Sequence, residues 1–404
     1  MGLSGRRRLL TITVPALAVS LIAVTAGIEI WVRVTWDPHK GRPGFFLSDA
    51  TRGQRLAAGY DGWFAGVPVH VNRLELRDTR EYELAKKPNT FRILVLGDSV
   101  TFGHGSVHAY PELLEARLKA WRREVDWQVW NAAVPGYNTS QELAHLLEVG
   151  RAFQPDLVIV GFFENDLTDN QPLQTPGRVR LVTTRVLSLA RRHLYSLELY
   201  KRIYLSAVWR FSRADQYRRR LEHLDTEESV LAASSADISA RPEQQLTPFD
   251  RLSDDQVGRV NCVYGMKPNA GLIQAMEHGP GYADWLNAVR AFQQLNRSGQ
   301  YRIVFFINDV PPVCPDGDVF YDGGSSAIDA FYMRILGDGT PAVSCYDAFL
   351  HVRPSQMPNA TAHAIGNANV VKADVLFEFL RPRLLPPPAP GPAPDAGAPS
   401  APSR

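Results

Sequence analysis

Cysteine is scarce in this 404-residue chain, and its three cysteines are widely separated: Cys262, Cys314 and Cys345. No group of cysteines and histidines has the spacing of a zinc site, so we expect no structural metal, and no motif indicates a cofactor. In an oxidising compartment the spacing is compatible with one disulfide and one free thiol, or with three unpaired, buried thiols. Spacing alone does not choose between these two arrangements.

An excess of charge of either sign is also absent. The chain has 44 Lys and Arg residues and 42 Asp and Glu residues, which gives a net charge of +2. This balance provides no electrostatic reason to bind nucleic acid, so we expect no nucleic-acid partner. The local basic runs Arg191–His193 and Arg218–Arg220 are more typical of a solvated helix face than of a polyanion site.

The two ends of the chain differ in their apolar content. Residues 386–404 consist almost wholly of Pro, Ala, Gly and Ser, which bury too little apolar surface to fold. At the other end, three arginines, Arg6, Arg7 and Arg8, precede a mostly apolar run from Leu9 to Ile28 that is long enough to span a bilayer.

A basic flank stays in the cytoplasm, so the sequence predicts a single-pass protein of the cell membrane with the rest of the chain outside the cytoplasm. Residues 1–36 would form this anchor, with Trp31 and Trp36 near the outer interface. A cleaved signal peptide is the alternative, and Val24-Thr25-Ala26 is then a marginal cleavage site.

One segment presents a serine where a buried strand is expected to end. The apolar run Ile93-Leu94-Val95-Leu96 stops at Gly97-Asp98-Ser99, and the pattern of Tyr110, Leu114 and Leu118 then predicts a helix. Open α/β sheets carry their reactive groups at the carboxyl ends of strands. Ser99 is therefore a candidate nucleophile, although Gly-Asp-Ser is also an ordinary turn.

Two further predicted strands end in small or polar residues. The segment from Trp127 to Asn131 leads into Gly136, and the segment from Asp156 to Val160 leads into Asn165. The Gly136 backbone N–H and the Asn165 amide are suitable donors for the oxyanion of an acyl-transfer intermediate. The structural alternative is that Gly136 only shapes a turn and Asn165 only caps the next segment.

These segments resemble the SGNH, or GDSL-type, hydrolase family, whose four blocks centre on Ser, Gly, Asn and His. Gly97–Ser99 matches the first block, Asn131–Gly136 the second and Gly161–Asp166 the third. The resemblance implies a flavodoxin-like α/β/α sandwich with a parallel sheet. It also implies a serine nucleophile and an oxyanion hole from the Ser99 N–H, the Gly136 N–H and the Asn165 side chain. Asp98 and Asp166 also match family positions, but Asp98 is better explained as a hydrogen-bonding residue of the turn after the strand, and Asp166 as a cap of the following segment.

The fourth block supplies a base, for which imidazole is well suited because its ordinary pKa lies near neutrality. His363 is the best placed of the ten histidines, in a loop before a last amphipathic helix, and His351 is the next candidate. Ala360 stands where the family usually carries the Asp that orients the histidine. The site would then be a Ser–His dyad, would take an acid from elsewhere in the chain, or would have a weakened activity. On another alignment, which matches Pro358-Asn359-Ala360 to the family, Met357 replaces the base itself.

The predicted organisation follows from these blocks. Residues 37–90 form an ordered lead-in, residues 91–385 form the hydrolase-like domain, and a helical insertion at about 171–280 interrupts it. Because the insertion follows Asn165, one expectation is a lid or acceptor-binding surface over the site. The alternative is a peripheral element. Its apolar side chains, Leu194, Leu197, Tyr200 and Tyr204 among them, either pack in the core or rest on the membrane.

The sequence thus predicts a membrane-anchored serine esterase that hydrolyses carboxylic esters through an acyl-enzyme, with Ser99 and His363 as the catalytic pair. The expected substrate is a small-molecule, lipid or glycan ester. One alternative is an O-acyltransferase that uses the same acyl-enzyme with an envelope glycan. The other is a catalytically weak binding protein that keeps the fold, which Ala360 and Met357 favour.

Overall fold

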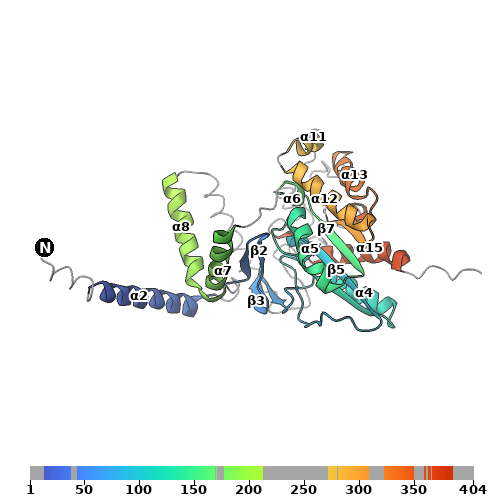
Figure 1. Cartoon of the computed structure of the whole chain (residues 1–404). Coiled ribbons are helices and arrows are strands. Elements are labelled where there is room, and N and C mark those ends of the chain that lie inside the picture. Colours follow the sequence, from blue (N-terminus) through green and yellow to red (C-terminus); the bar gives the residue numbers. More distant parts are fainter. Residues whose placement is uncertain are drawn as a thin grey trace, which may run out of the picture.

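A computed structural model describes residues 13–37, 43–168, 170, 177–212, 272–279, 281–308, 323–349, 359–360, 363–364 and 366–384 (Figure 1). Its centre is a five-stranded sheet with the order β6-β5-β7-β8-β9, and every neighbouring pair is parallel. The strands are β5 (Thr90–Gly97), β6 (Asp126–Asn131), β7 (Leu157–Phe162), β8 (Ile303–Ile307) and β9 (Ala342–Ser344). This is the flavodoxin-like strand order, so the predicted fold is confirmed.

Helices cover both faces of the sheet, because successive side chains along each strand point to opposite faces. Leu94, Leu96 and Val160 belong to one hydrophobic cluster, whereas Ile93 and Ile159 belong to another. The first cluster is completed by α5 (Thr139–Phe153), α11 (Leu272–Glu277), α12 (Tyr282–Arg297) and α13 (Gly323–Leu336). The second is completed by α4 (Tyr110–Trp121), α14 (Tyr346–Phe349) and α15 (Asn367–Leu384).

Residues 43–72 form two antiparallel hairpins that pack beside the sheet. The hairpins are β1 (Phe46–Asp49) with β2 (Gly53–Leu56), and β3 (Tyr60–Phe64) with β4 (Val67–Val71). Their buried side chains share a third hydrophobic cluster with Phe102, which follows β5, and with Val134 and Tyr137, which follow β6. The hairpins therefore support the segments that leave the carboxyl ends of these two strands.

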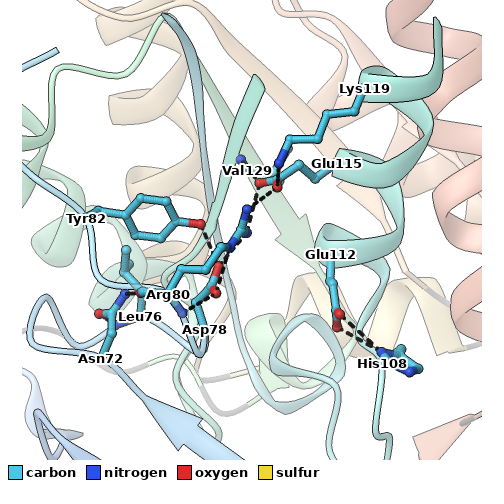
Figure 2. A network of polar contacts seen from close by, with 10 residues as sticks. All are labelled: Asn72, Leu76, Asp78, Arg80, Tyr82, His108, Glu112, Glu115, Lys119 and Val129. Atoms are coloured by element: carbon cyan, nitrogen blue, oxygen red, sulfur yellow. Dashed lines mark hydrogen bonds and ion pairs between the residues drawn. The ribbon is translucent and has the colours of Figure 1, made fainter. Parts of the chain in front are cut away.

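A polar network joins the end of the lead-in to the sheet (Figure 2). Arg80 forms ion pairs with Asp78 and Glu115, and Glu115 also accepts the backbone N–H of Val129 at 2.7 Å. Burial alone would raise the pKa of Asp78, but hydrogen bonds from Arg80 and Tyr82 lower it below its ordinary value. Because β6 is an edge strand, Glu115 satisfies a backbone donor that no neighbouring strand can reach.

The N-terminal helix α2 (Val14–Thr35) is apolar and long enough to cross a membrane, and none of its apolar window is buried. A membrane anchor and a signal sequence share this length and composition. Arg6–Arg8 lie outside the described residues. The predicted helical stretch of the insertion appears as α7 (Arg178–His193) and α8 (Ser196–Ser212), and residues 213–271 also lie outside the described part. The domain boundaries remain predictions.

We expect Leu56→Ala to destabilise the whole domain, because Leu56 is fully buried in the cluster shared by the hairpins and the sheet. The expected loss is about 2 to 5 kcal/mol, as for other large-to-small core substitutions. Leu84→Ala is the control, since Leu84 is 42% exposed and its truncation should cost less than about 0.5 kcal/mol. Denaturant unfolding of the solubilised full chain measures both. A separate early transition that alone shifts in Leu56→Ala would show that the hairpins fold independently.

Candidate active site

Ser99 lies at the first turn after β5. Gly97 ends the strand, and the four-residue helix α3 (Ser99–Phe102) begins at once. The Asp98 carboxylate accepts the backbone N–H of Val100 at 2.8 Å and the Ser99 hydroxyl at 3.4 Å. Asp98 is thus the N-cap of α3, which confirms its interpretation as a turn residue. Ser99 is half-buried, whereas residues 92–98 are buried, so Ser99 is the accessible residue of this turn.

The strand order places this turn at a topological switch point. β5 is hydrogen-bonded to β6 on one side and to β7 on the other. The connection from β5 leads to β6 on one side, and the connection from β7 leads to β8 on the other, which opens a crevice beyond the carboxyl ends of β5 and β7. Ser99 follows β5 directly and so stands in the position where this class of sheet binds its ligands.

Two glycines allow α3 to approach the strand ends. Gly97 and Gly161 are paired in register across β5 and β7. A Cβ atom built on either glycine would lie 2.2 Å from Oγ1 of Thr101, which is far closer than atoms can pack. The same Oγ1 accepts hydrogen bonds from the Tyr110 hydroxyl at 3.1 Å and from the Asn308 amide at 3.2 Å. Thr101 therefore occupies space that only glycines at both positions leave open.

His363 is brought to Ser99 from a distant part of the chain. It belongs to the hairpin of β10 (Asn359–Ala360) and β11 (His363–Ala364), in which Ala360 is the backbone partner of His363. Its Nε2 lies 2.7 Å from the Ser99 hydroxyl oxygen. The predicted nucleophile and the predicted base are thus within hydrogen-bond distance. His351 and Met357 lie outside the described residues.

The two predicted oxyanion donors are placed at the same edge of the sheet. Gly136 follows β6 with a φ of 79°, a left-handed conformation that favours glycine, and the Val134 N–H before it donates to the Gly97 carbonyl at 3.0 Å. Asn165 is the first residue of α6 (Asn165–Thr168) and follows β7. Asp166 lies within α6, and its carboxylate accepts the N–H of Phe163, which precedes the helix, at 2.9 Å.

Comparisons with known proteins agree with this arrangement. Residues 95–270 match the model of the GDSL-like Lipase/Acylhydrolase family. This segment contains Ser99, Gly136 and Asn165 in the order of the family's blocks. This segment of the chain is similar to the GDSL-like acylhydrolases. The predicted resemblance is confirmed, and the class of activity is that of an esterase or acylhydrolase.

The solved structures to which this chain is similar are distant in sequence. One is a GDSL-like lipase from Bacteroides thetaiotaomicron, with 9% identity, 75% of this chain and 93% of that chain covered, and a TM-score of 0.33. Another is a variant of an acetyl xylan esterase from Geobacillus stearothermophilus, with 12% identity, 72% and 94% covered, and a TM-score of 0.37. No curated protein matches the chain.

His104 is a residue of the candidate site that the sequence did not single out. Its ring is stacked on the His363 ring, with centroids 4.3 Å apart and planes 15° from parallel. The backbone N–H of His104 donates to the Ser99 carbonyl at 2.9 Å. The Phe64 ring meets the His104 ring edge-on, with ring centroids 5.3 Å apart. The stack fixes the plane of the imidazole whose Nε2 contacts Ser99. Its only sequence signal is a histidine soon after the nucleophile and flanked by Gly103 and Gly105.

Arg77 holds the loop that carries His104. Its guanidinium donates to the carbonyls of Phe102, Gly103, Ser106 and Val107, the last at 3.1 Å. Burial lowers the pKa of Arg77 to about 10, so the group is still charged at neutral pH. Hydrogen bonds from a charged donor are stronger than neutral ones, and four of them converge on this short segment. Arg77 therefore attaches the loop that carries His104 to the segment before the sheet, residues 37–90.

Asp98, which precedes Ser99, interacts electrostatically with two other buried ionisable groups. Asp98, Glu142 and Lys372 have no exposed surface. Burial, and then the negative charge of Asp98, raise the pKa of Glu142 well above its ordinary value. Burial also raises the pKa of Asp98, against its backbone hydrogen bonds and the positive charge of Lys372. Burial and the neighbouring Asp98 carboxylate thus favour the neutral form of Glu142.

Among the residues that the structure describes, no group of three or more His, Cys, Asp and Glu side chains is arranged to hold a metal ion. Cys345 is buried, and its thiol donates to the Ile307 carbonyl at 3.1 Å. Cys262 and Cys314 lie outside the described residues, so the pairing of the cysteines stays a prediction.

We expect His104→Ala to lower the kcat for ester hydrolysis roughly three- to tenfold with little change in KM, because an aromatic pair is worth about 0.5 to 1.5 kcal/mol. His104→Phe keeps a ring against His363 and should restore most of the rate. His108→Ala is the control, because the described partner of the His108 ring is Glu112. Equal rates in His104→Ala and the unaltered chain would show that the stack does not position the base.

Proposed function

We propose that this protein is a membrane-anchored serine esterase that hydrolyses carboxylic esters outside the cytoplasm, with Ser99 as nucleophile and His363 as general base. The observation that carries the proposal is the 2.7 Å separation between His363 Nε2 and the Ser99 hydroxyl oxygen. A serine hydroxyl is a weak nucleophile at neutral pH, and an imidazole at hydrogen-bond distance activates it by accepting its proton. The position of Ser99 at the switch point and the family match support the same roles.

In the proposed reaction, the Ser99 oxygen attacks the ester carbonyl carbon while His363 Nε2 takes the hydroxyl proton. The carbonyl oxygen becomes an oxyanion, which the Ser99 N–H, the Gly136 N–H and the Asn165 amide stabilise, one such donor being worth about 3 kcal/mol. The intermediate expels the alcohol, and His363 protonates it. Water then attacks the acyl-enzyme with His363 as base again, which releases the acid and restores Ser99.

The His104 stack takes on particular importance in this scheme. A carboxylate partner commonly fixes the orientation of the base, and Ala360 stands where the family resemblance expects that carboxylate. The ring of His104 restricts the same rotation from the face of the imidazole. The His363 hairpin supplies a second restraint, because backbone pairing with Ala360 fixes the position of the His363 main chain.

The proposed location rests on α2 and its surroundings. The helix is long and apolar enough to span a bilayer, and the arginines Arg6–Arg8 before it favour a cytoplasmic N-terminus. The alternative cleavage site, Val24–Ala26, lies inside the helix, which continues to Thr35. An uncleaved anchor is therefore favoured. The proposed substrates are esters of the cell envelope, with a small acyl group on a glycan or a lipid.

We expect Ser99→Ala to abolish hydrolysis of p-nitrophenyl acetate, with a change in stability of less than about 1 kcal/mol because the side chain is not part of the core. The full chain in detergent is assayed for acid release, with and without an oligosaccharide acceptor. Free acetate in both cases supports a hydrolase, whereas acetyl transfer to the oligosaccharide through Ser99 would assign an acyltransferase instead. A Ser99→Ala variant that keeps more than a small residual rate would refute the nucleophile.

A further inference from the structure

Helix α7 exposes a continuous row of apolar side chains. Val179, Val182, Val186 and Leu189 are 79%, 62%, 62% and 65% exposed, and no residue of the helix is buried. Their spacing of three and four residues places them on one face. We call these four residues the outer stripe of α7. An apolar face of this kind on a protein surface usually marks a binding surface.

The outer stripe faces away from the catalytic domain. The opposite side of α7 contacts the first hairpin and the segment after it: the Ser188 hydroxyl donates to the Ser48 carbonyl at 2.8 Å, and Arg192 donates to the Ala58 carbonyl at 3.2 Å. Figure 1 shows α7 between these hairpins on one side and α2 and α8 on the other. The stripe therefore lies on the side from which α2 leaves the domain.

The link between α7 and α8 is fixed to the end of α2. The two carboxylate oxygens of Glu29 accept the N–H groups of Tyr195 and Ser196, each at 2.9 Å. The Arg33 guanidinium donates to the His193 carbonyl, and the Trp36 ring meets the Tyr195 ring edge-on at 5.6 Å. If α2 spans the bilayer, these contacts place the end of α7 and the start of α8 at its outer surface.

Helix α8 carries a second exposed apolar row. Tyr200, Ile203, Tyr204 and Phe211 are 40%, 56%, 62% and 85% exposed and share one face, while Leu205 on the other side of the helix is buried. We call these four residues the outer stripe of α8. Figure 1 shows α8 rising across the direction of α2, and the two helices are in contact. A helix that crosses a membrane anchor at its outer end lies nearer to the plane of the bilayer than to its normal.

The charges around the stripes match a lipid surface. Residues 178–212 contain eight arginine and lysine residues and a single acidic residue, Glu198. Long basic side chains extend from an apolar helix face to the phosphate groups, and each adds about 1 kcal/mol of attraction near an anionic membrane. An exposed apolar face with tyrosine and arginine at its borders is typical of helices that lie in the membrane interface.

We propose, on the basis of the membrane anchor proposed above, that α7 and α8 lie on the outer leaflet of the membrane, with both outer stripes in the boundary between headgroups and acyl chains and the arginines at anionic lipid phosphates. The catalytic domain then has two attachments to the bilayer. The second attachment removes the rotation about α2 that a single helix allows, and holds the Ser99 site at a fixed side of the membrane surface.

Fluorescence quenching by brominated lipids tests this proposal on the full chain. The chain is placed in nanodiscs of phosphatidylcholine and phosphatidylglycerol with brominated acyl chains. A bimane label is attached at Val186→Cys in the outer stripe of α7, at Val19→Cys in α2, or at Leu147→Cys, a site on α5 that is 56% exposed. The unsubstituted chain, labelled in parallel, gives the contribution of the native cysteines. We expect quenching at Val19 and Val186 that is at least threefold stronger than at Leu147.

The labels at these three positions distinguish a failure of the inference about α7 from a failure of the proposed membrane anchor. Quenching at Val19 but not at Val186 would overturn the inference and leave the anchor in place. A lack of quenching at Val19 would refute the anchor and the inference with it, while esterase activity is measured independently. Cross-linking of two copies through Val186→Cys without quenching would show that a second chain covers the stripe instead.

A charge variant provides a second measurement. The double substitution Val182→Asp and Val186→Asp should lower the quenching of a label at Tyr204→Cys at least twofold, because carboxylates resist burial among lipids. Leu147→Asp, a matched apolar-to-acidic change on α5, should leave that quenching unchanged. Unchanged quenching in the double variant would count against membrane contact through α7.

Discussion

The packing of Thr101 against Gly97 and Gly161 is the constraint on which the arrangement of the site depends. Two neighbouring parallel strands carry paired glycines near their carboxyl ends, and Thr101 fills the space with its hydroxyl bonded to Tyr110 and Asn308. This close contact lets α3 start immediately after β5, with Asp98 as its cap. Ser99 is thereby held at the switch point of the sheet on the shortest possible connection, rather than on a long loop.

The remaining parts of the site are brought to this fixed point by other segments. Arg77 holds the loop that follows α3, so that His104 is stacked against the ring of His363. The side chain of Asn369 on α15 donates to the Ser106 hydroxyl of the same loop at 2.9 Å. The loop is thus fixed from the lead-in and from the last helix. The geometry of the Ser99–His363 pair consequently depends on residues that precede the central sheet and on residues of the last helix.

The sequence predicted the strands that are buried on both faces, because each is a continuous apolar run bounded by polar or glycine residues. It did not predict β9, whose three residues are only half-buried. The hairpin of β3 and β4 had a recognisable signal, since Ala65-Gly66 is a two-residue turn with φ of 50° and 77° between apolar stretches. The break between α7 and α8 had none, because Glu29 of a distant helix fixes it.

The residues of the candidate site likewise fall into those that the sequence could indicate and those that it could not. The placement of Ser99, Gly136 and Asn165 at one edge of the sheet could be predicted, because each lies in the segment after a strand and parallel strands bring their carboxyl ends to one edge. His363 was predictable from its place before the last amphipathic helix. His104 was not, because its contact with His363 arises only when Gly103, at φ 85°, turns the chain back toward the site. Patterns along the sequence report strands and their ends, whereas ring stacking between distant loops follows from the folded structure.

The most direct test of the account is the reactivity of Ser99 toward a fluorophosphonate probe, with the modified residue located by peptide mass spectrometry. An activated serine reacts covalently with such a probe, whereas an ordinary surface serine does not. We expect one equivalent of label on the peptide that contains Ser99, and at least a hundredfold slower labelling in His363→Ala. Absence of label on Ser99 in the folded chain, or labelling at the same rate without His363, would contradict the assignment of a working nucleophile and base.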